Sequence, residues 1–274
     1  MQNPSTIGFI GAGNMAYALI SGLINNGYAP ENLAISDTNS ELLSLRQQEF
    51  NLEVFTDNAQ LAKTCDVVVL ATKPQVLAQV CGDIAEHVQE QLIVSIAAGV
   101  HSHDIDRWLG KNKAIVRTMP NTPALLAQGV SGLFANEHTT KAQKTLAEQI
   151  MNAVGKSLWV ESEPLLDAVT AVSGSGPAYF FLMIESMVKA GEALGLDRAT
   201  ANQLSIETAL GAAMMASNAP DSVRKLREQV TSPNGTTQAA IESFQDQDFE
   251  VIVAHALRAA YTRAGELGAE LGDQ

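Results

Sequence analysis

A glycine-rich turn near the start of the chain has the residue types that bind a phosphate. The segment from Gly11 to Ala16 reads GAGNMA and directly follows an apolar strand pattern. Gly11 permits a tight turn, Gly13 lets the backbone approach a pyrophosphate, and Ala16 is small enough for the next helix to pack against the strand. The free N–H groups at the start of that helix would face the negative charge. The pattern predicts a dinucleotide site with candidate contacts at Gly11, Ala12, Gly13, Asn14 and Met15.

The end of the second predicted strand bears on the choice of dinucleotide. An acid at this place, Asp37, typically accepts hydrogen bonds from the adenine ribose of NAD and repels the 2′-phosphate of NADP. Its neighbours Ser36 and Thr38 offer neutral donors beside a helix start, and such donors could hold a phosphate without an arginine. All three are candidate cofactor contacts. The residues alone lean towards NAD and leave NADP open.

Three further strand ends carry residues suited to a ligand, because doubly wound sheets bind ligands at the carboxyl ends of their strands. In the run Ala71-Thr72-Lys73-Pro74, Lys73 could face a cofactor phosphate or a substrate carboxylate. The small residues Ala97, Ala98 and Gly99 would let a flat nicotinamide ring lie against the backbone. Asn121, in a loop flanked by prolines, could donate to the nicotinamide or to the substrate. A solvated lysine, helix–sheet packing and a turn-forming asparagine are the structural alternatives.

A turn in the last third of the chain is rich in hydrogen-bond donors. Ser232, Thr236 and Thr237 supply hydroxyls, Gly235 frees the backbone, and a helix is predicted to start at the two threonines. Such a helix N-terminus suits a small carboxylate without any arginine. A helix cap with no ligand is the alternative.

The elements that would position these residues differ between the two halves of the chain. Strands alternate with helical patterns in the first half, which predicts a doubly wound parallel sheet of the Rossmann type, an α/β fold. These strands are expected at Thr6–Gly11, Leu33–Ser36, Leu52–Phe55, Asp66–Ala71, Leu92–Ile96 and Ala114–Met119. Helical patterns alone follow from Asp167 onward, at Tyr179–Leu194, Arg198–Ser217, Thr236–Gln245 and Phe249–Gly268. We therefore expect a dinucleotide-binding domain at residues 1–162 and an all-helical domain at residues 163–274.

The helical pattern at Arg198–Ser217 is apolar around much of its circumference. A helix of that kind is buried on several sides, and few loops remain in the chain to cover it. The pattern predicts that a second copy of the chain covers it.

Composition excludes several classes of partner. The 274 residues carry a formal net charge of −13, which argues against a nucleic-acid partner because phosphate neutralisation needs a basic surface. We expect no membrane segment and no leader peptide, and hence a cytoplasmic protein. Cys65 and Cys81 are too few for a disulfide framework, and the five histidines have no metal-ligand spacing, so no metal is expected.

The motifs taken together resemble the pyrroline-5-carboxylate reductase family, which catalyses the last step of proline biosynthesis. The resemblance is carried by GFIGAGNMA at Gly8–Ala16, by Lys73-Pro74, SIAAGV, MPNTPA and SGSGPAY, and by the TSPNGTT turn at Thr231–Thr237. It spans nearly the whole chain in the family's order. Asn234 departs from the family, which usually has glycine there, but asparagine tolerates a left-handed backbone.

This resemblance implies an N-terminal Rossmann domain, an all-helical C-terminal dimerisation domain and NADPH as the usual hydride donor, with NADH possible. It implies a homodimer, often assembled into a decamer built from dimers. Carried over by position, Asn58 contacts the adenosine of the cofactor. Ser232, Gly235, Thr236 and Thr237 bind the substrate carboxylate and ring nitrogen, and Thr237 is the candidate catalytic contact to that nitrogen.

Three other functions fit parts of the pattern. A β-hydroxyacid dehydrogenase resembles this plan but places a lysine on the first long C-terminal helix, where this chain has none until Lys189. An imine reductase acting on another substrate would share the same two-domain plan. A non-catalytic dinucleotide sensor would have no use for the turn at Ser232–Thr237. The small-molecule substrate expected is a cyclic imine.

Overall fold

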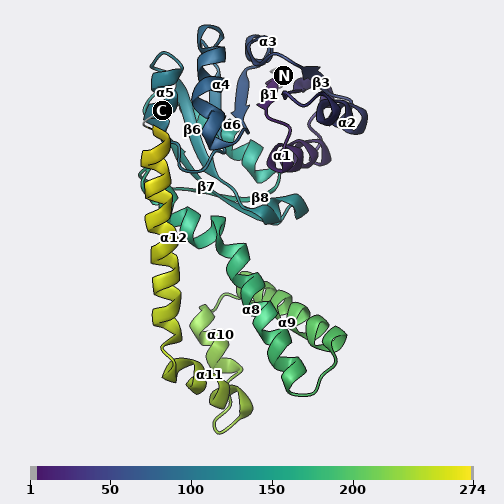
Figure 1. Ribbon diagram of the computed structural model, residues 1–274, viewed down its shortest axis with the longest axis vertical. Helices are drawn as coiled ribbons and strands as arrows, with labels where there is room; N and C mark the ends of the chain where they lie inside the picture. Colours follow the sequence, from purple (N-terminus) through teal and green to yellow (C-terminus); the bar gives the residue numbers. More distant parts are fainter. Residues whose placement is uncertain (1–4, 273–274) are drawn as a thin grey trace. The chain divides into compact units, whose positions relative to one another are not determined.

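A computed structural model describes residues 5–272. The first four residues, on which the expectation of no leader partly rests, lie outside this range. The chain divides into two compact units (Figure 1). The first contains the residues up to Ser175 and those from Ala260 onward, and the second contains Gly176–Ala259.

An eight-stranded sheet forms the centre of the first unit, in the order β3-β2-β1-β4-β5-β6-β7-β8. The strands are β1 (Ile7–Ile10), β2 (Leu33–Ser36), β3 (Glu53–Phe55), β4 (Val67–Leu70), β5 (Leu92–Ser95), β6 (Ala114–Met119), β7 (Gly129–Ala135) and β8 (Gly155–Trp159). All neighbours are parallel except β6 and β7, which are antiparallel. The predicted doubly wound sheet is confirmed, and β7 and β8 extend it beyond the strands expected from the sequence.

Helices cover both faces of this sheet because its central strands are apolar on both sides. In β4, Val67 and Val69 belong to one buried cluster, whereas Val68 and Leu70 belong to the other. The first face packs against α1 (Asn14–Asn25) and α6 (Lys141–Asn152). The second packs against α3 (Asn58–Thr64), α4 (Leu77–Ile84) and α5 (Ser102–Trp108). The helix α2 (Ser40–Phe50) follows β2.

The second unit is helical, as expected. It contains α8 (Gly176–Ala193), α9 (Arg198–Asn218), α10 (Val223–Gln229), α11 (Thr236–Asp246) and the first part of α12 (Phe249–Gly272). Within residues 5–272 no strand follows Trp159. No helix in this range is long and apolar enough to cross a membrane.

The helix α9 is exposed in the single chain, although its sequence is largely apolar. Only Ala201 and Ser205 are buried among its residues. Exposed large apolar side chains on it are Leu204, Ile206, Leu210, Met214 and Met215. The apolar surface that the sequence indicated is therefore left uncovered by this chain.

The first compact unit continues to Ser175, beyond the boundary after residue 162 that the sequence predicted. The short helix α7 (Leu165–Val169) packs on β7, where a Cβ added to Gly132 would lie 2.7 Å from Val169 Cγ1. The end of α12 packs on the loop after β5, where a Cβ added to Gly268 would lie 2.9 Å from Gly99 O. These close contacts place both segments in the first unit. The functional boundary at residues 162 and 163 stays a prediction.

Candidate functional site

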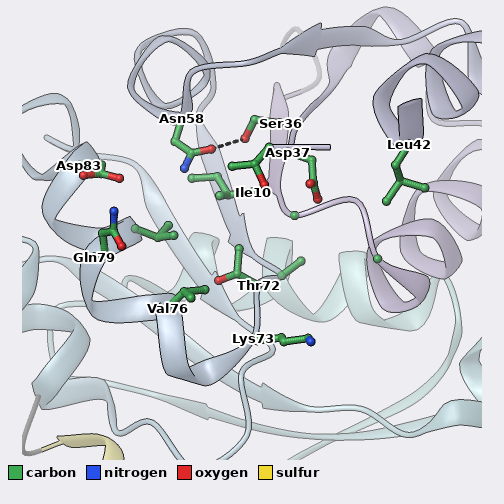
Figure 2. Close-up of a pocket in the computed structure, with 15 residues that line it drawn as sticks. Ile10, Ser36, Asp37, Leu42, Asn58, Thr72, Lys73, Val76, Gln79 and Asp83 are labelled. Atoms are coloured by element: carbon green, nitrogen blue, oxygen red, sulfur yellow. Dashed lines mark hydrogen bonds between the residues drawn. The ribbon is translucent and has the colours of Figure 1, made fainter. Parts of the chain in front are cut away.

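A cavity of about 470 Å³ lies at the carboxyl ends of β1, β2 and β4 (Figure 2). Sheets of this topology bind ligands at that edge. The lining residues are Ile10, Gly11, Gly13, Ser36, Asp37, Thr38, Leu42, Asn58, Ala71, Thr72, Lys73, Val76, Gln79, Val80 and Asp83. Nine of the candidate cofactor contacts are therefore in one cavity, although they come from four separate segments.

The turn between β1 and α1 uses its two glycines for different reasons. Gly11 has φ +105, and an added Cβ would lie 2.6 Å from the carbonyl oxygen of Ala71. Gly13 has an ordinary φ of −70, and no described atom lies within 4 Å of where its Cβ would be. Gly11 is thus required by the fold. Gly13 keeps the floor of the cavity open next to the start of α1, which is the cradle that a pyrophosphate needs.

Asp37 has two backbone partners. Its Oδ2 accepts a 2.7 Å hydrogen bond from the N–H of Ala12, and its Oδ1 accepts one of 2.8 Å from the N–H of Asn39. The carboxylate therefore connects the glycine-rich turn to the start of α2. Sequence reasoning gave Asp37 only a ribose contact and missed this structural role.

Ser36 and Asn58 form a polar pair at the back of the cavity. The Ser36 hydroxyl is fully buried and donates a 2.7 Å hydrogen bond to Asn58 Oδ1. Because this bond fixes the amide oxygen, the Asn58 amide nitrogen is the group that points into the cavity (Figure 2). Asn58 thus presents a donor to a ligand.

Thr72 carries a buried hydroxyl without a hydrogen-bond partner among the described residues. An unsatisfied buried hydroxyl costs stability, and because Thr72 borders the cavity, a ligand bound there would supply the missing partner. The next residue, Lys73, is exposed and is the one cation among the described residues that line the cavity. An open glycine turn, an unpaired hydroxyl and a single cation together fit an anionic dinucleotide.

Six lining residues were not predicted from the sequence. Ile10 and Leu42 belong to the β1 and α2 segments, and Val76, Gln79, Val80 and Asp83 lie on or beside α4. The signal for the second group was present in the sequence, since positions three, four and seven residues apart share one face of a helix.

Several expected cofactor contacts lie outside the cavity lining. Ala12, Asn14, Met15 and Pro74 belong to the same two turns but do not border the cavity. Ala97, Ala98 and Gly99 form the loop after β5, in which Ala97 is buried and Gly99 has φ +83. Their contact with a nicotinamide stays a prediction.

Asn121 has a structural role that the sequence did not indicate. It is 8% exposed. Its amide nitrogen donates to Ser173 O at 3.1 Å, and its amide oxygen accepts from the N–H of Val130 at 2.9 Å. Both halves of the amide therefore join parts of the protein. The contact with the nicotinamide or the substrate that the sequence suggested for Asn121 stays a prediction.

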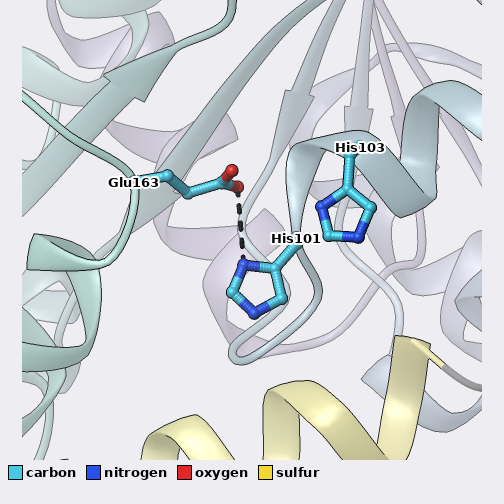
Figure 3. Close-up of side chains that lie close together, drawn as sticks. All are labelled: His101, His103 and Glu163. Carbon is cyan, nitrogen blue, oxygen red and sulfur yellow. Dashed lines mark ion pairs between the residues drawn. The ribbon is translucent and has the colours of Figure 1, made fainter.

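His101, His103 and Glu163 lie close together beside α5 (Figure 3). The two histidines stack, and Glu163 Oε1 is 3.9 Å from His101 Nδ1. Glu163, however, already accepts hydrogen bonds from Arg117 at 2.8 Å, from the N–H of Ser102 at 2.6 Å and from its hydroxyl at 2.9 Å. Glu163 therefore forms an ion pair with Arg117 of β6 and hydrogen bonds with the start of α5. The nearby guanidinium would repel a cation, which argues against a metal site here.

Burial of Glu163 opposes its ionisation, but the charge of Arg117 and the hydrogen bonds from Arg117 and Ser102 outweigh it, and the pKa of Glu163 is lowered. The neighbouring Asp167 is affected in the opposite direction. Burial raises its pKa although Arg117 and His101 partly offset this. The lowered pKa keeps the Glu163 carboxylate ionised where it accepts hydrogen bonds from Ser102, the first residue of α5.

The donor-rich turn of the second unit has the predicted conformation. Gly235 is the N-cap of α11, and Thr236 and Thr237 begin the helix. Asn234 adopts the left-handed φ of +60, and its N–H donates to Gln238 Oε1 at 2.7 Å. Ser232, Thr236 and Thr237 are exposed. The turn therefore survives the departure from glycine at position 234.

Comparison with known proteins gives matches in both halves of the chain. Residues 163–267 match the family model for pyrroline-5-carboxylate reductase dimerisation, and residues 6–99 match that for NADP oxidoreductase, coenzyme F420-dependent. A pyrroline-5-carboxylate reductase of Pseudomonas aeruginosa is 51% identical over 97% of this chain and 98% of its own length. One from Arabidopsis thaliana is 36% identical over 95% of each chain.

Solved structures also match this chain over nearly its full length. A pyrroline-5-carboxylate reductase from Coxiella burnetii is 45% identical and has a TM-score of 0.93 over 97% of this chain and 99% of its own. A pyrroline carboxylate reductase from Plasmodium falciparum, solved with NADP bound, is 30% identical, with a TM-score of 0.86 over 98% and 99%. The resemblance inferred from the motifs is confirmed, and the chain belongs to the pyrroline-5-carboxylate reductase family.

Proposed function

We propose that this protein reduces the C=N bond of 1-pyrroline-5-carboxylate with NADPH and so forms L-proline. The observation that carries the proposal is a cavity with a phosphate-binding turn in a chain that matches pyrroline-5-carboxylate reductases over almost its whole length. NADPH would supply the hydride, which is chemistry that no side chain provides. The protein contributes binding and orientation.

The cavity residues hold the cofactor in this proposal. Gly11, Gly13 and the start of α1 bind the pyrophosphate. Lys73 offers it a positive charge, and the Thr72 hydroxyl offers a hydrogen bond to the bound cofactor. Ser36, Asp37, Thr38 and Asn58 surround the adenosine. Backbone N–H groups already engage both oxygens of Asp37, which leaves the carboxylate fewer acceptor positions for the ribose hydroxyls of NADH. NADH stays a second donor to be tested.

The proposed substrate site is the turn at the start of α11. Ser232, Gly235 and Thr236 offer donors to the substrate carboxylate. The Thr237 hydroxyl hydrogen-bonds the ring nitrogen, accepting from the N–H of the iminium or donating to the neutral imine. A cyclic imine nitrogen is basic, so the substrate can arrive as an iminium that needs no strong acid from the protein. Orientation of its C=N carbon then contributes most of what the protein supplies.

The proposed assembly is a homodimer, with a decamer built from dimers as the larger form. The exposed apolar residues of α9 and the match to a dimerisation family support it. The proposed compartment is the cytoplasm, in keeping with Cys65 and Cys81, which are both free and buried.

Reduction of a ketone by a lysine-dependent dehydrogenase is the less favoured function. The lysine nearest the start of α8 is Lys189, which is exposed and pairs with Glu185 at 2.6 Å. It is thus bound to a carboxylate on the surface of its own helix, which does not favour a role as a general acid.

Two substitutions test the substrate site. Thr237→Ala removes a hydrogen bond to a nitrogen that changes during the reaction, so kcat and KM should both suffer. A bond of about 1–3 kcal/mol corresponds to roughly 5- to 150-fold in kcat/KM. Ser232→Ala should mainly raise the substrate KM. If Thr237→Ala keeps the wild-type kcat/KM for the imine, the turn is not the substrate site.

A further inference from the structure

One wall of the cavity is built by α4 and carries both apolar and polar residues. Val76 and Val80 lie one helical turn apart, and Val76 is 46% exposed although it is apolar. Gln79 and Asp83 also lie one turn apart and line the same cavity, opposite Asn58 (Figure 2). An apolar surface with three polar side chains at its edge has the composition of a site for a flat heterocycle.

The position of Asp83 is unexpected for a site that takes an anion. The protein already has a net charge of −13, and a carboxylate in the cavity adds to the repulsion of phosphate groups. The phosphate-binding features are elsewhere in the cavity, at the β1–α1 turn and at Lys73. Asp83 therefore marks the end that receives an uncharged group, and a carboxylate there can only accept hydrogen bonds.

The three polar residues differ in what they can recognise. Ser36 fixes the Asn58 oxygen, so Asn58 offers a donor to the cavity. Gln79 can present either its oxygen or its nitrogen by rotating its amide. The carboxylate of Asp83 offers acceptors and no donor, so it distinguishes a donor on the ligand from an acceptor.

We infer that Asp83 recognises the purine base of the cofactor by accepting a hydrogen bond from the 6-amino group of adenine. A 6-oxo purine, which has an acceptor at that position, would bind less tightly. Gln79 adapts to the base edge, Asn58 donates to a ring nitrogen, and Val76 and Val80 cover a face of the ring. This inference rests on the proposed function in that the ligand is the adenine dinucleotide NADPH. It adds a determinant of base specificity that the pyrophosphate-binding turn does not provide.

Equilibrium binding tests the inference with two cofactors that differ only in the base. NADPH and its hypoxanthine analogue, in which a 6-oxo group replaces the 6-amino group, are titrated calorimetrically into the wild-type protein and into Asp83→Asn. One hydrogen bond at an exposed site predicts a wild-type preference for NADPH of roughly 2- to 10-fold. Asp83→Asn should abolish or reverse this preference, because an amide can donate to the 6-oxo group.

Glu86→Gln is the matched control. Glu86 is an exposed acid just beyond α4 that does not line the cavity, so this variant should keep the wild-type ratio of the two dissociation constants. The same ratio in Asp83→Asn and in the wild type would overturn the inference. Reduction of the imine by the wild type with NADPH is measured in parallel. Its absence would refute the proposed function and leave the ratio of binding constants to decide the role of Asp83.

Discussion

At the scale of single residues, Thr72 shows how a binding site can cost stability. Its hydroxyl is buried without a partner among the described residues, and it borders the cavity. Thr72→Val keeps the shape of the side chain and removes the unpaired group. We expect the free energy of unfolding of the protein without cofactor to rise by about 1 kcal/mol. The affinity for NADPH should fall several-fold, because the hydroxyl then has nothing to offer the cofactor.

Thermal unfolding with and without NADPH measures both effects. Ser157→Ala is the control, since the Ser157 hydroxyl on β8 is also buried without a partner but lies outside the cavity lining. It should stabilise the protein to a similar extent and leave the dissociation constant of NADPH unchanged. Equal NADPH binding by Thr72→Val and the wild type would contradict the role given to Thr72.

At the scale of elements, the two glycines of the β1–α1 turn have different roles, Gly11 in folding and Gly13 in cofactor binding. Gly13→Ala should fold normally, since the backbone φ is ordinary and the new Cβ meets no described atom. It should still weaken NADPH binding by about tenfold or more, because the methyl group occupies the place of the pyrophosphate.

Gly11→Ala is the complementary variant. It should lower the melting temperature, since φ is +105 and the added Cβ meets the carbonyl oxygen of Ala71 at 2.6 Å. Calorimetry and thermal melts of the pair give the comparison. A normal NADPH affinity in Gly13→Ala would show that the turn does not hold the pyrophosphate.

The ion pair between β6 and the segment before α7 makes a prediction about pH. Glu163 has a folded pKa below its ordinary value of 4.5, so its contribution to stability is present above that value and is lost as the pH falls through the lower folded pKa. Glu163→Gln should lower the free energy of unfolding by about 1–3 kcal/mol at pH 7, because the buried Arg117 guanidinium loses a charge-assisted hydrogen bond.

The test is the difference in unfolding free energy between the wild type and Glu163→Gln as a function of pH. Asp167 is present in both proteins, and burial is the main cause of its raised pKa whereas Glu163 is the smallest, so its opposite contribution largely cancels in this comparison. The difference should shrink on going from pH 6 to below about pH 4. A difference that is independent of pH would mean that Glu163 is not the titrating group.

At the scale of elements, some features of the site could be predicted from the sequence and others could not. The β1–α1 turn was predictable because strand, glycines and helix follow one another directly in the chain. The structural role of Asn121 was missed because its amide is held by Ser173, a partner 52 positions away that no local pattern reveals. Asp83 and Gln79 were missed since their place in the cavity depends on how α4 packs, although their helical spacing was visible.

At the scale of the whole molecule, the exposed apolar residues of α9 predict that a second copy of the chain covers them in a homodimer. Sedimentation equilibrium should give a mass of at least twice 29.1 kDa. Leu210→Asp, at an exposed position on α9, should shift the protein towards the monomer because it would bury an unpaired charge in the interface. A fully active wild-type monomer at low concentration would contradict the proposed assembly.

The central claim, that the protein moves a hydride from NADPH to the C=N carbon of 1-pyrroline-5-carboxylate, is tested most directly by isotope transfer. The intact protein is incubated with the imine and with NADPH that carries deuterium at both C4 positions of the nicotinamide, and the product is examined by mass spectrometry and NMR. We predict proline that is one mass unit heavier, with the deuterium bound to C5. Absence of proline, or proline without deuterium at C5, would contradict the claim.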